Sequence, residues 1–314
     1  MPLPSTPISI KPSTSEIKEG VLTQKNLEIA IRALARDGLV VIEDLVQHAT
    51  LDKLNTKMVE DAYDLQSRKD SPFNYNKGNI QQDPPMVKGF FSEEVFTDPI
   101  VTQVTSTALG PKPSLRFMSG NTALPPTADS PPASQPIHND ADFDHPQIPF
   151  ALVVNVPLIT MEVQNGSTEV WLGTHSNTTI ADQEGAHGER ASGRIKKDLL
   201  EARRKVRAPS QPTVKKGSII VRDLRLWHGG KPNLSDKPRV MLAMIHFAPW
   251  YRNQMTIEFA EDLKDELTPE KTGLHVAAEY VSSDEVEKSY LNRPYGNAYD
   301  FDQTDKVQGL FPED

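Results

Sequence analysis

The stretch Gln135-Pro136-Ile137-His138-Asn139-Asp140 places a histidine and an aspartate two residues apart. On an extended strand, residues two apart point to the same side, so these two side chains would face the same way. Such a triplet is a weak signal when it stands alone. It gains weight from a distant second stretch, Leu226-Trp227-His228-Gly229-Gly230, which supplies a further histidine.

Together these stretches predict a metal site. Two imidazoles and one carboxylate on one face of a metal leave three positions open, which is typical of non-haem iron(II) oxygenases. His138, Asp140 and His228 are therefore the candidate ligands. Arg239 follows eleven residues after His228, across a turn rich in Pro, Asn and Asp, on a segment with the pattern of a strand. The alternative interpretation is structural, with the first two residues in a loop and His228 as a hydrogen-bonded strand residue.

The composition is that of a globular enzyme, with 37% hydrophobic and 25% charged residues in a chain of 314. A net charge of −9 argues against non-specific binding of nucleic acid. The absence of cysteine excludes disulfides and thiolate ligands and is compatible with a reducing compartment, so we expect a cytoplasmic location. We also expect no membrane partner, because no apolar run approaches the ~20 residues of a membrane helix. The N-terminus shows no secretory signal pattern.

The order of predicted elements indicates a mainly β protein with flanking helices. Residues 1–22 are rich in Pro, Ser and Thr, and we expect a flexible arm there. Thr23 is placed as an N-cap, and Gly38 can end the helical pattern that follows it. Apolar runs predict strands at residues 39–42, 114–118, 150–158, 168–172, 217–221 and 239–247.

The spacing of these strands predicts a jelly roll, that is, a cupin-like double-stranded β-helix core. Further helices are expected at residues 51–65, 99–109 and 195–206. We expect residues 23–314 to form a single domain, with helices before the core and a C-terminal extension after it.

At several points in order, the chain resembles the phytanoyl-CoA dioxygenase family of iron(II)- and 2-oxoglutarate-dependent oxygenases. It is most similar to the fungal branch that acts in secondary metabolism. The resemblance is carried by residues 35–42, 135–140, 165–170 and 173–176, and by His228 with Arg239. It extends from about residue 21 to residue 250. Residues 251–314 show no pattern that can be matched, and their role is left open.

The resemblance implies a role for each candidate residue. The three candidate ligands would hold Fe(II), which 2-oxoglutarate would chelate through its keto acid end, with O2 as co-substrate. Arg239 matches the family's position for the far carboxylate of 2-oxoglutarate, which a planar guanidinium can bind through two parallel hydrogen bonds. The resemblance places three more residues at the cofactor: Thr168 on the same carboxylate, Gln135 near the iron and, on a looser match, Asn79.

These observations predict an enzyme that oxidises an unactivated C–H bond of a small organic molecule by hydroxylation, desaturation or oxidative cyclisation. We expect it to act in secondary-metabolite biosynthesis, with a homodimer as one possible assembly. One alternative is a non-oxidative metal enzyme on the same barrel, such as a zinc hydrolase. Arg239 and Thr168 argue against it, because hydrolysis needs no clamp for a dicarboxylate. The other is a catalytically silent small-molecule-binding relative, against which three intact ligands argue.

Overall fold

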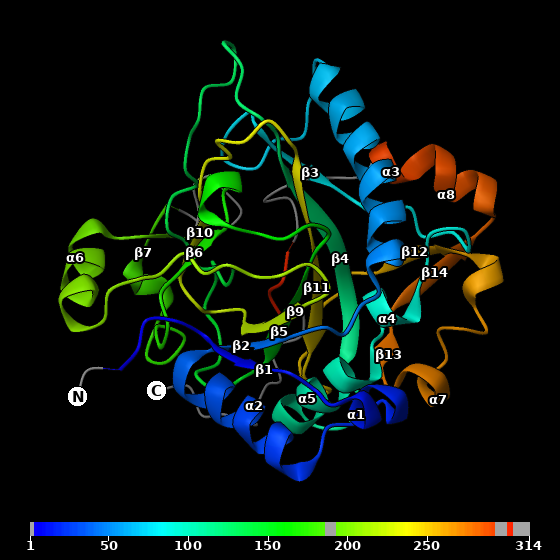
Figure 1. Cartoon of the computed structure of the whole chain (residues 1–314), viewed down its shortest axis with the longest axis horizontal. Helices are drawn as coiled ribbons and strands as arrows, with labels where there is room; N and C mark the ends of the chain where they lie inside the picture. The colour runs from blue at the N-terminus through cyan, green and yellow to red at the C-terminus, as the bar shows by residue number, and fades with distance from the viewer. Residues whose placement is uncertain (1–2, 186–192, 293–299, 304–314) are drawn as a thin grey trace.

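One large sheet forms the centre of the molecule in the computed structural model, which describes residues 3–185, 193–292 and 300–303. Antiparallel pairing of its long strands brings together segments from both halves of the chain (Figure 1). The strand order is β1 (Ile8–Ile10), β2 (Leu39–Ile42), β9 (Ile219–Asp223), β5 (Ala151–Pro157), β11 (Arg239–Phe247), β4 (Ser114–Ala123) and β13 (His275–Val276), with β3 (Asn79–Gln82) also paired to β4.

A second layer is built from shorter strands. In it, β10 (His228–Gly230) pairs with β6 (Thr168–Val170), and β7 (Gln183–Glu184) pairs with β8 (Arg194–Ile195). His138 joins the two pairs, because it forms backbone bridges to His228 and to Arg194. A further parallel pair, β12 (Ile257–Ala260) and β14 (Ala278–Val281), lies beside α8 (Ser283–Ser289). Residues of the two layers line one cavity, as a double-stranded β-helix requires.

Helices cover the outer face of the large sheet. They are α2 (Gln24–Asp37), α3 (His48–Ser67) and α5 (Pro99–Leu109). A further helix, α6 (Lys197–Val206), lies at the opposite edge of the molecule from α3 (Figure 1). Short helices complete the set: α1 (Thr14–Glu19), α4 (Glu93–Phe96) and α7 (Pro269–Thr272). No helix in the described part of the chain is long and apolar enough to cross a membrane.

Along the central strands, side chains point alternately to a face that packs against the helices and to a face that lines the cavity. In β11, Val240, Leu242 and Met244 belong to the hydrophobic core beneath the helices, whereas Arg239 and Met241 line the cavity. Successive side chains of a strand point to opposite faces, so one strand supplies both the core and the site.

The predicted helix between Thr23 and Gly38 is confirmed. The Thr23 side chain accepts a hydrogen bond from the Asn26 N–H at 3.4 Å, and Gly38 ends the helix with φ 75°. A φ in this range suits glycine, which has no Cβ to clash. The predicted start of α5 is confirmed as well, because the Asp98 carboxylate accepts from the Val101 N–H at 2.9 Å.

The expected flexible arm at residues 1–22 is wrong for the part that the structure describes. Residues 8–10 form β1, which extends the large sheet by parallel pairing with β2. Ser13 and Glu16 then form a capping box at the start of α1. The composition suggested disorder, but this Ser-x-x-Glu signature and the apolar Ile8 and Ile10 provide local order and burial that composition does not record.

A prediction concerns Glu16, which is only 4% exposed and holds the N-terminal segment to α2. Its carboxylate accepts from the N–H groups of Ser13 and Thr23, both at 2.7 Å, and the Ser13 bond contributes most to lowering the Glu16 pKa to about 2. Because the folded-state pKa is the lower one, the stabilisation is present above about pH 4.5 and is lost as the pH falls towards 2. Glu16→Gln should reduce the free energy of unfolding by about 1.5–3 kcal/mol at pH 7.

Thermal unfolding of this variant, measured at pH 7 and pH 3, checks the prediction. The difference in melting temperature between Glu16→Gln and the wild type should be smaller at pH 3 than at pH 7. Glu19→Gln, at an exposed position of the same helix, is the control and should leave both melting temperatures unchanged. Equal stability of Glu16→Gln and wild type at pH 7 would contradict the assignment.

Candidate metal and cofactor site

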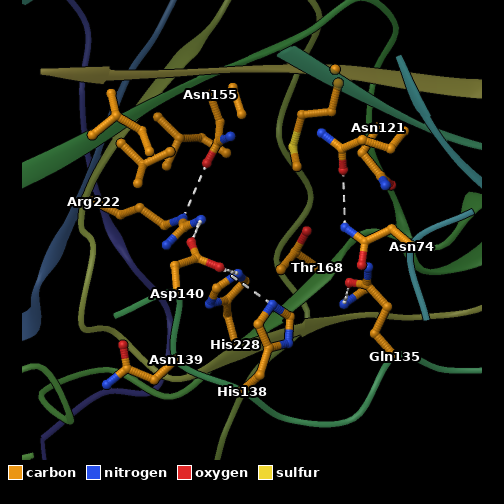
Figure 2. A pocket seen from close by; sticks show the side chains of 18 of the residues that line it. Asn74, Asn121, Gln135, His138, Asn139, Asp140, Asn155, Thr168, Arg222 and His228 are labelled. Carbon is orange, nitrogen blue, oxygen red and sulfur yellow. Dashed lines mark hydrogen bonds and ion pairs between the residues drawn. The ribbon is translucent and has the colours of Figure 1, made fainter. Parts of the chain in front are cut away.

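The three candidate ligands converge between the two layers (Figure 2). His138 and His228 are backbone partners, because each N–H donates to the other's carbonyl, at 2.9 and 3.0 Å. Asp140 Oδ1 lies 3.4 Å from His138 Nε2 and 3.7 Å from His228 Nε2. One ligand atom from each residue can be chosen so that all lie within 4.8 Å of one another. The residues selected by the sequence pattern therefore form one cluster.

Hydrogen bonds leave one nitrogen of each imidazole free. Nδ1 of His138 lies 2.9 Å from the Pro136 carbonyl, and Nδ1 of His228 lies 2.9 Å from the Leu226 carbonyl. A carbonyl oxygen can only accept, so each Nδ1 carries a proton, and in the neutral ring the lone pair is then on Nε2. This is the form in which histidine binds a metal through Nε2.

The protonation states also suit a cation. Burial and the nearby Arg222 lower the pKa of His228 well below its usual value, so its ring is neutral. Burial alone would raise the pKa of Asp140, but Arg222 and the two histidines hold it well below the usual range, so the carboxylate is charged. Neutral imidazole and ionised carboxylate are the metal-binding forms, and the set therefore fits a divalent cation such as iron(II).

Arg239 lies in the same cavity and is only 2% exposed. Its Nη2 donates to the Gly166 carbonyl at 2.9 Å, while its Nε has no partner among the described residues. Burial lowers the pKa of Arg239 to about 10, so it remains a cation at pH 7. A buried cation is costly unless an anion accompanies it, and no carboxylate of the described chain does so. The space beside Arg239 therefore fits a ligand with a carboxylate.

Thr168 and Gln135 line the cavity together with Arg239. Thr168 begins β6 and pairs with Gly230 of the strand that carries His228. Gln135 Oε1 accepts from the Gly230 N–H at 2.8 Å, which fixes this side chain beside the same strand. The structure thus brings together every site residue expected from the sequence except Asn79.

Asn79 takes another position. Its carbonyl accepts from the Asn74 N–H at 2.7 Å, and its Nδ2 donates to the Asn74 carbonyl at 3.0 Å, so it closes a turn. It lines a smaller hollow that Gln135 and Arg239 also border, not the main cavity. Asn74 does line the main cavity, where its Nδ2 donates to Gln81 at 3.1 Å and its Oδ1 has no partner among the described residues.

Sequence reasoning missed two buried polar residues of the site. Arg222 in β9 donates from Nη2 to Asp140 Oδ2 at 2.6 Å and from Nε to Asn155 Oδ1 at 3.2 Å (Figure 2). Asn155 is in β5, and both side chains line the cavity. Asn155 interrupts an otherwise apolar strand, and Arg222 follows the apolar run 219–221 as a buried charge; these are the signals that could have identified them.

Aromatic residues from distant segments complete the cavity. The Tyr75 ring lies 5.0 Å from the His138 ring, and its backbone φ of 65° is uncommon for a bulky residue. Phe301 packs edge-to-face on Phe117, with ring centroids 5.1 Å apart, and its carbonyl accepts from the Tyr251 hydroxyl at 3.1 Å. The C-terminal extension therefore reaches the cavity, where an apolar wall is formed by Phe117, Val153, Ala243, Ile245 and Phe301.

Comparison with solved structures shows the same fold in two other proteins. The epimerase SnoN, solved with Fe3+, alpha ketoglutarate and nogalamycin RO, is 16% identical, with a TM-score of 0.55 over 72% of this chain and 84% of that chain. AviO1 from Streptomyces viridochromogenes Tue57 is also 16% identical, with a TM-score of 0.53 over 74% of this chain and 99% of that chain. These similarities confirm the predicted mainly β, jelly-roll fold.

A family model described as phytanoyl-CoA dioxygenase matches residues 34–241, more than half of the 314 residues. The matched segment contains all three candidate metal ligands as well as Arg239. The chain therefore belongs to the phytanoyl-CoA dioxygenase (PhyH) family of iron(II)- and 2-oxoglutarate-dependent oxygenases.

Proposed function

We propose that this dioxygenase oxidises an unactivated C–H bond of a small organic molecule in secondary-metabolite biosynthesis, using Fe(II), 2-oxoglutarate and O2. One observation carries the proposal: a His-Asp-His cluster shares its cavity with Arg239, a buried cation that has no anion among the described residues. A metal-dependent hydrolase has no need of that cation. A silent binding protein has no need of three converging metal ligands.

Each part of the cavity has a separate task in this proposal. His138, Asp140 and His228 would hold the iron, and Arg239 with Thr168 would hold the far carboxylate of 2-oxoglutarate. When bound, iron(II) and 2-oxoglutarate supply, with O2, the oxidising power that the side chains lack. The apolar wall that ends at Phe301 would receive the carbon skeleton of the substrate and exclude water.

The outcome of the reaction depends on where the substrate lies along this wall. Hydroxylation, desaturation and oxidative cyclisation start from the same C–H bond and differ in the bond formed afterwards. SnoN is named an epimerase, so inversion of a carbon centre is a further outcome on this fold.

Anaerobic titration of the Fe(II)-loaded protein with 2-oxoglutarate tests the class of reaction. A visible charge-transfer band should appear, and admission of O2 should then give succinate. Iron binding without the band would favour the hydrolase alternative, and the band without succinate would favour the silent one.

The first prediction here concerns the metal ligands. His138→Ala and His228→Ala should each abolish succinate formation and sharply weaken Fe(II) binding, because each removes one of only three protein ligands. Asp140→Ala should do the same, unless an added anion fills the position. Calorimetric titration with Fe(II) under anaerobic conditions measures the loss. His275→Ala, at an exposed position in β13, is the matched control and should bind iron normally. Near-normal affinity in all three ligand variants would refute the assignment.

A second prediction concerns Arg239. Losing a charge-assisted double hydrogen bond in a buried site should cost about 2–4 kcal/mol, or about 30- to 1000-fold in 2-oxoglutarate affinity. Arg239→Ala should show this loss in titrations of the Fe(II)-loaded protein. Arg239→Lys keeps the positive charge but lacks the planar guanidinium that can make two parallel hydrogen bonds, so it should recover only part of the lost 2-oxoglutarate affinity. An unchanged affinity in Arg239→Ala would mean that the carboxylate is held elsewhere.

A third prediction separates Asn74 from Asn79. Because the Asn74 amide lines the cavity, Asn74→Ala should weaken 2-oxoglutarate or substrate binding while leaving iron affinity unchanged. Asn79→Ala should mainly lower the melting temperature, since its side chain binds the backbone of the turn. Titration and thermal unfolding of both variants check this pair. If Asn79→Ala has the larger effect on cofactor affinity, Asn79 has the cofactor role that the resemblance implied.

A further inference from the structure

The two oxygens of Asp140 have different environments. Oδ1 faces the Nε2 atoms of His138 and His228, at 3.4 and 3.7 Å. Oδ2 points the other way and accepts a hydrogen bond from Arg222 Nη2 at 2.6 Å. Figure 2 shows Asp140 between the guanidinium and the imidazoles. The bond is short and charge-assisted, which makes it one of the stronger kinds of hydrogen bond in proteins.

Arg222 is itself held in place by the large sheet. Its side chain is only 9% exposed, and its Nε donates to Asn155 Oδ1 at 3.2 Å. Asn155 Nδ2 in turn donates to the Leu242 carbonyl at 3.1 Å. A connected series of hydrogen bonds therefore runs from the backbone of β11 through side chains of β5 and β9 to the carboxylate. Because these three strands are adjacent in the sheet, the guanidinium has little freedom to move away from Asp140.

We infer that Arg222 is a positioning residue that keeps Asp140 a ligand through one oxygen. A carboxylate can bind a metal through one or both oxygens. With two imidazoles, one-oxygen binding leaves three of six octahedral positions open, and two-oxygen binding leaves only two. A cosubstrate that chelates through two atoms fills two positions, and oxidation requires another. Arg222 would preserve that third position by occupying Oδ2. This inference rests on the proposed function.

The experiment uses the full-length protein loaded with Mn(II) as the probe metal, without 2-oxoglutarate. Broadening of the Mn(II) electron paramagnetic resonance signal in oxygen-17 water counts the water molecules on the metal. The wild type should hold about three and Arg222→Met about two, because the released Oδ2 takes one position. The dissociation constant of 2-oxoglutarate should rise about 10- to 100-fold in that variant. Mn(II) affinity should not fall, because a neighbouring cation has been removed.

Two further variants separate positioning from general support of the fold. Arg222→Lys retains a cation near Oδ2 and should restore the third water. Arg207→Met is the matched control: Arg207 is buried and pairs with Asp37 at 2.8 Å, outside the residues that line the cavity. Its loss should lower the melting temperature without changing the water count. If Arg222→Met does not fold, Arg222→Leu takes its place, because its neutral side chain also offers no donor to Oδ2.

The outcomes distinguish this inference from the proposed function. Equal water counts in wild type and Arg222→Met, or two waters in the wild type, would overturn the positioning role. Failure of the proposed function would instead appear as no 2-oxoglutarate binding by any Mn(II)-loaded form, while the water counts could still differ between variants.

Discussion

The backbone pairing of His138 with His228 is the interaction on which the site depends. Two N–H···O bonds join a loop-borne segment to β10, although these segments are far apart in the sequence. The pairing sets the distance between the two imidazoles and directs Asp140, two residues on, to the same place. Since these backbone hydrogen bonds hold the two histidines together, they pre-organise the ligand set, and less entropy is lost when a cation binds.

The large sheet supports the metal-ligand cluster because one of its faces is apolar and packed, whereas the other carries buried polar side chains. The outer face packs against helices with aliphatic side chains, whereas the inner face carries Arg222, Asn155 and Arg239 in a buried setting. Buried polar atoms normally have partners, yet Arg239 Nε and Asn74 Oδ1 have none among the described residues. Both residues line the same cavity. The outer face therefore provides stability, while the inner face retains polar groups whose hydrogen-bonding needs a ligand can meet.

Much of this fold and site can be predicted from sequence, because some signals are local. A threonine cap and a terminal glycine delimit α2, and the two-residue spacing of His138 and Asp140 holds on any extended segment. Other features depend on which strands become neighbours. Arg222 acquires its role only because Asn155 lies on the adjacent strand and Asp140 opposite it. Asn79 matches the family pattern only loosely, and the turn that it closes places Asn74, not Asn79, at the main cavity.

The contact between Phe301 and Phe117 brings the C-terminal extension to the cavity that holds the metal ligands. The matched family segment ends at residue 241 and contains the metal ligands, whereas Phe301 belongs to the extension beyond it. The metal ligands and Phe301, which forms part of the apolar wall of the cavity, thus come from separate stretches of the sequence. If the apolar wall receives the substrate, as proposed, substitutions in the later stretch would change which molecule is admitted while the histidine pairing stays intact. Selection acting on such a chain can explore new substrates without putting the metal centre at risk.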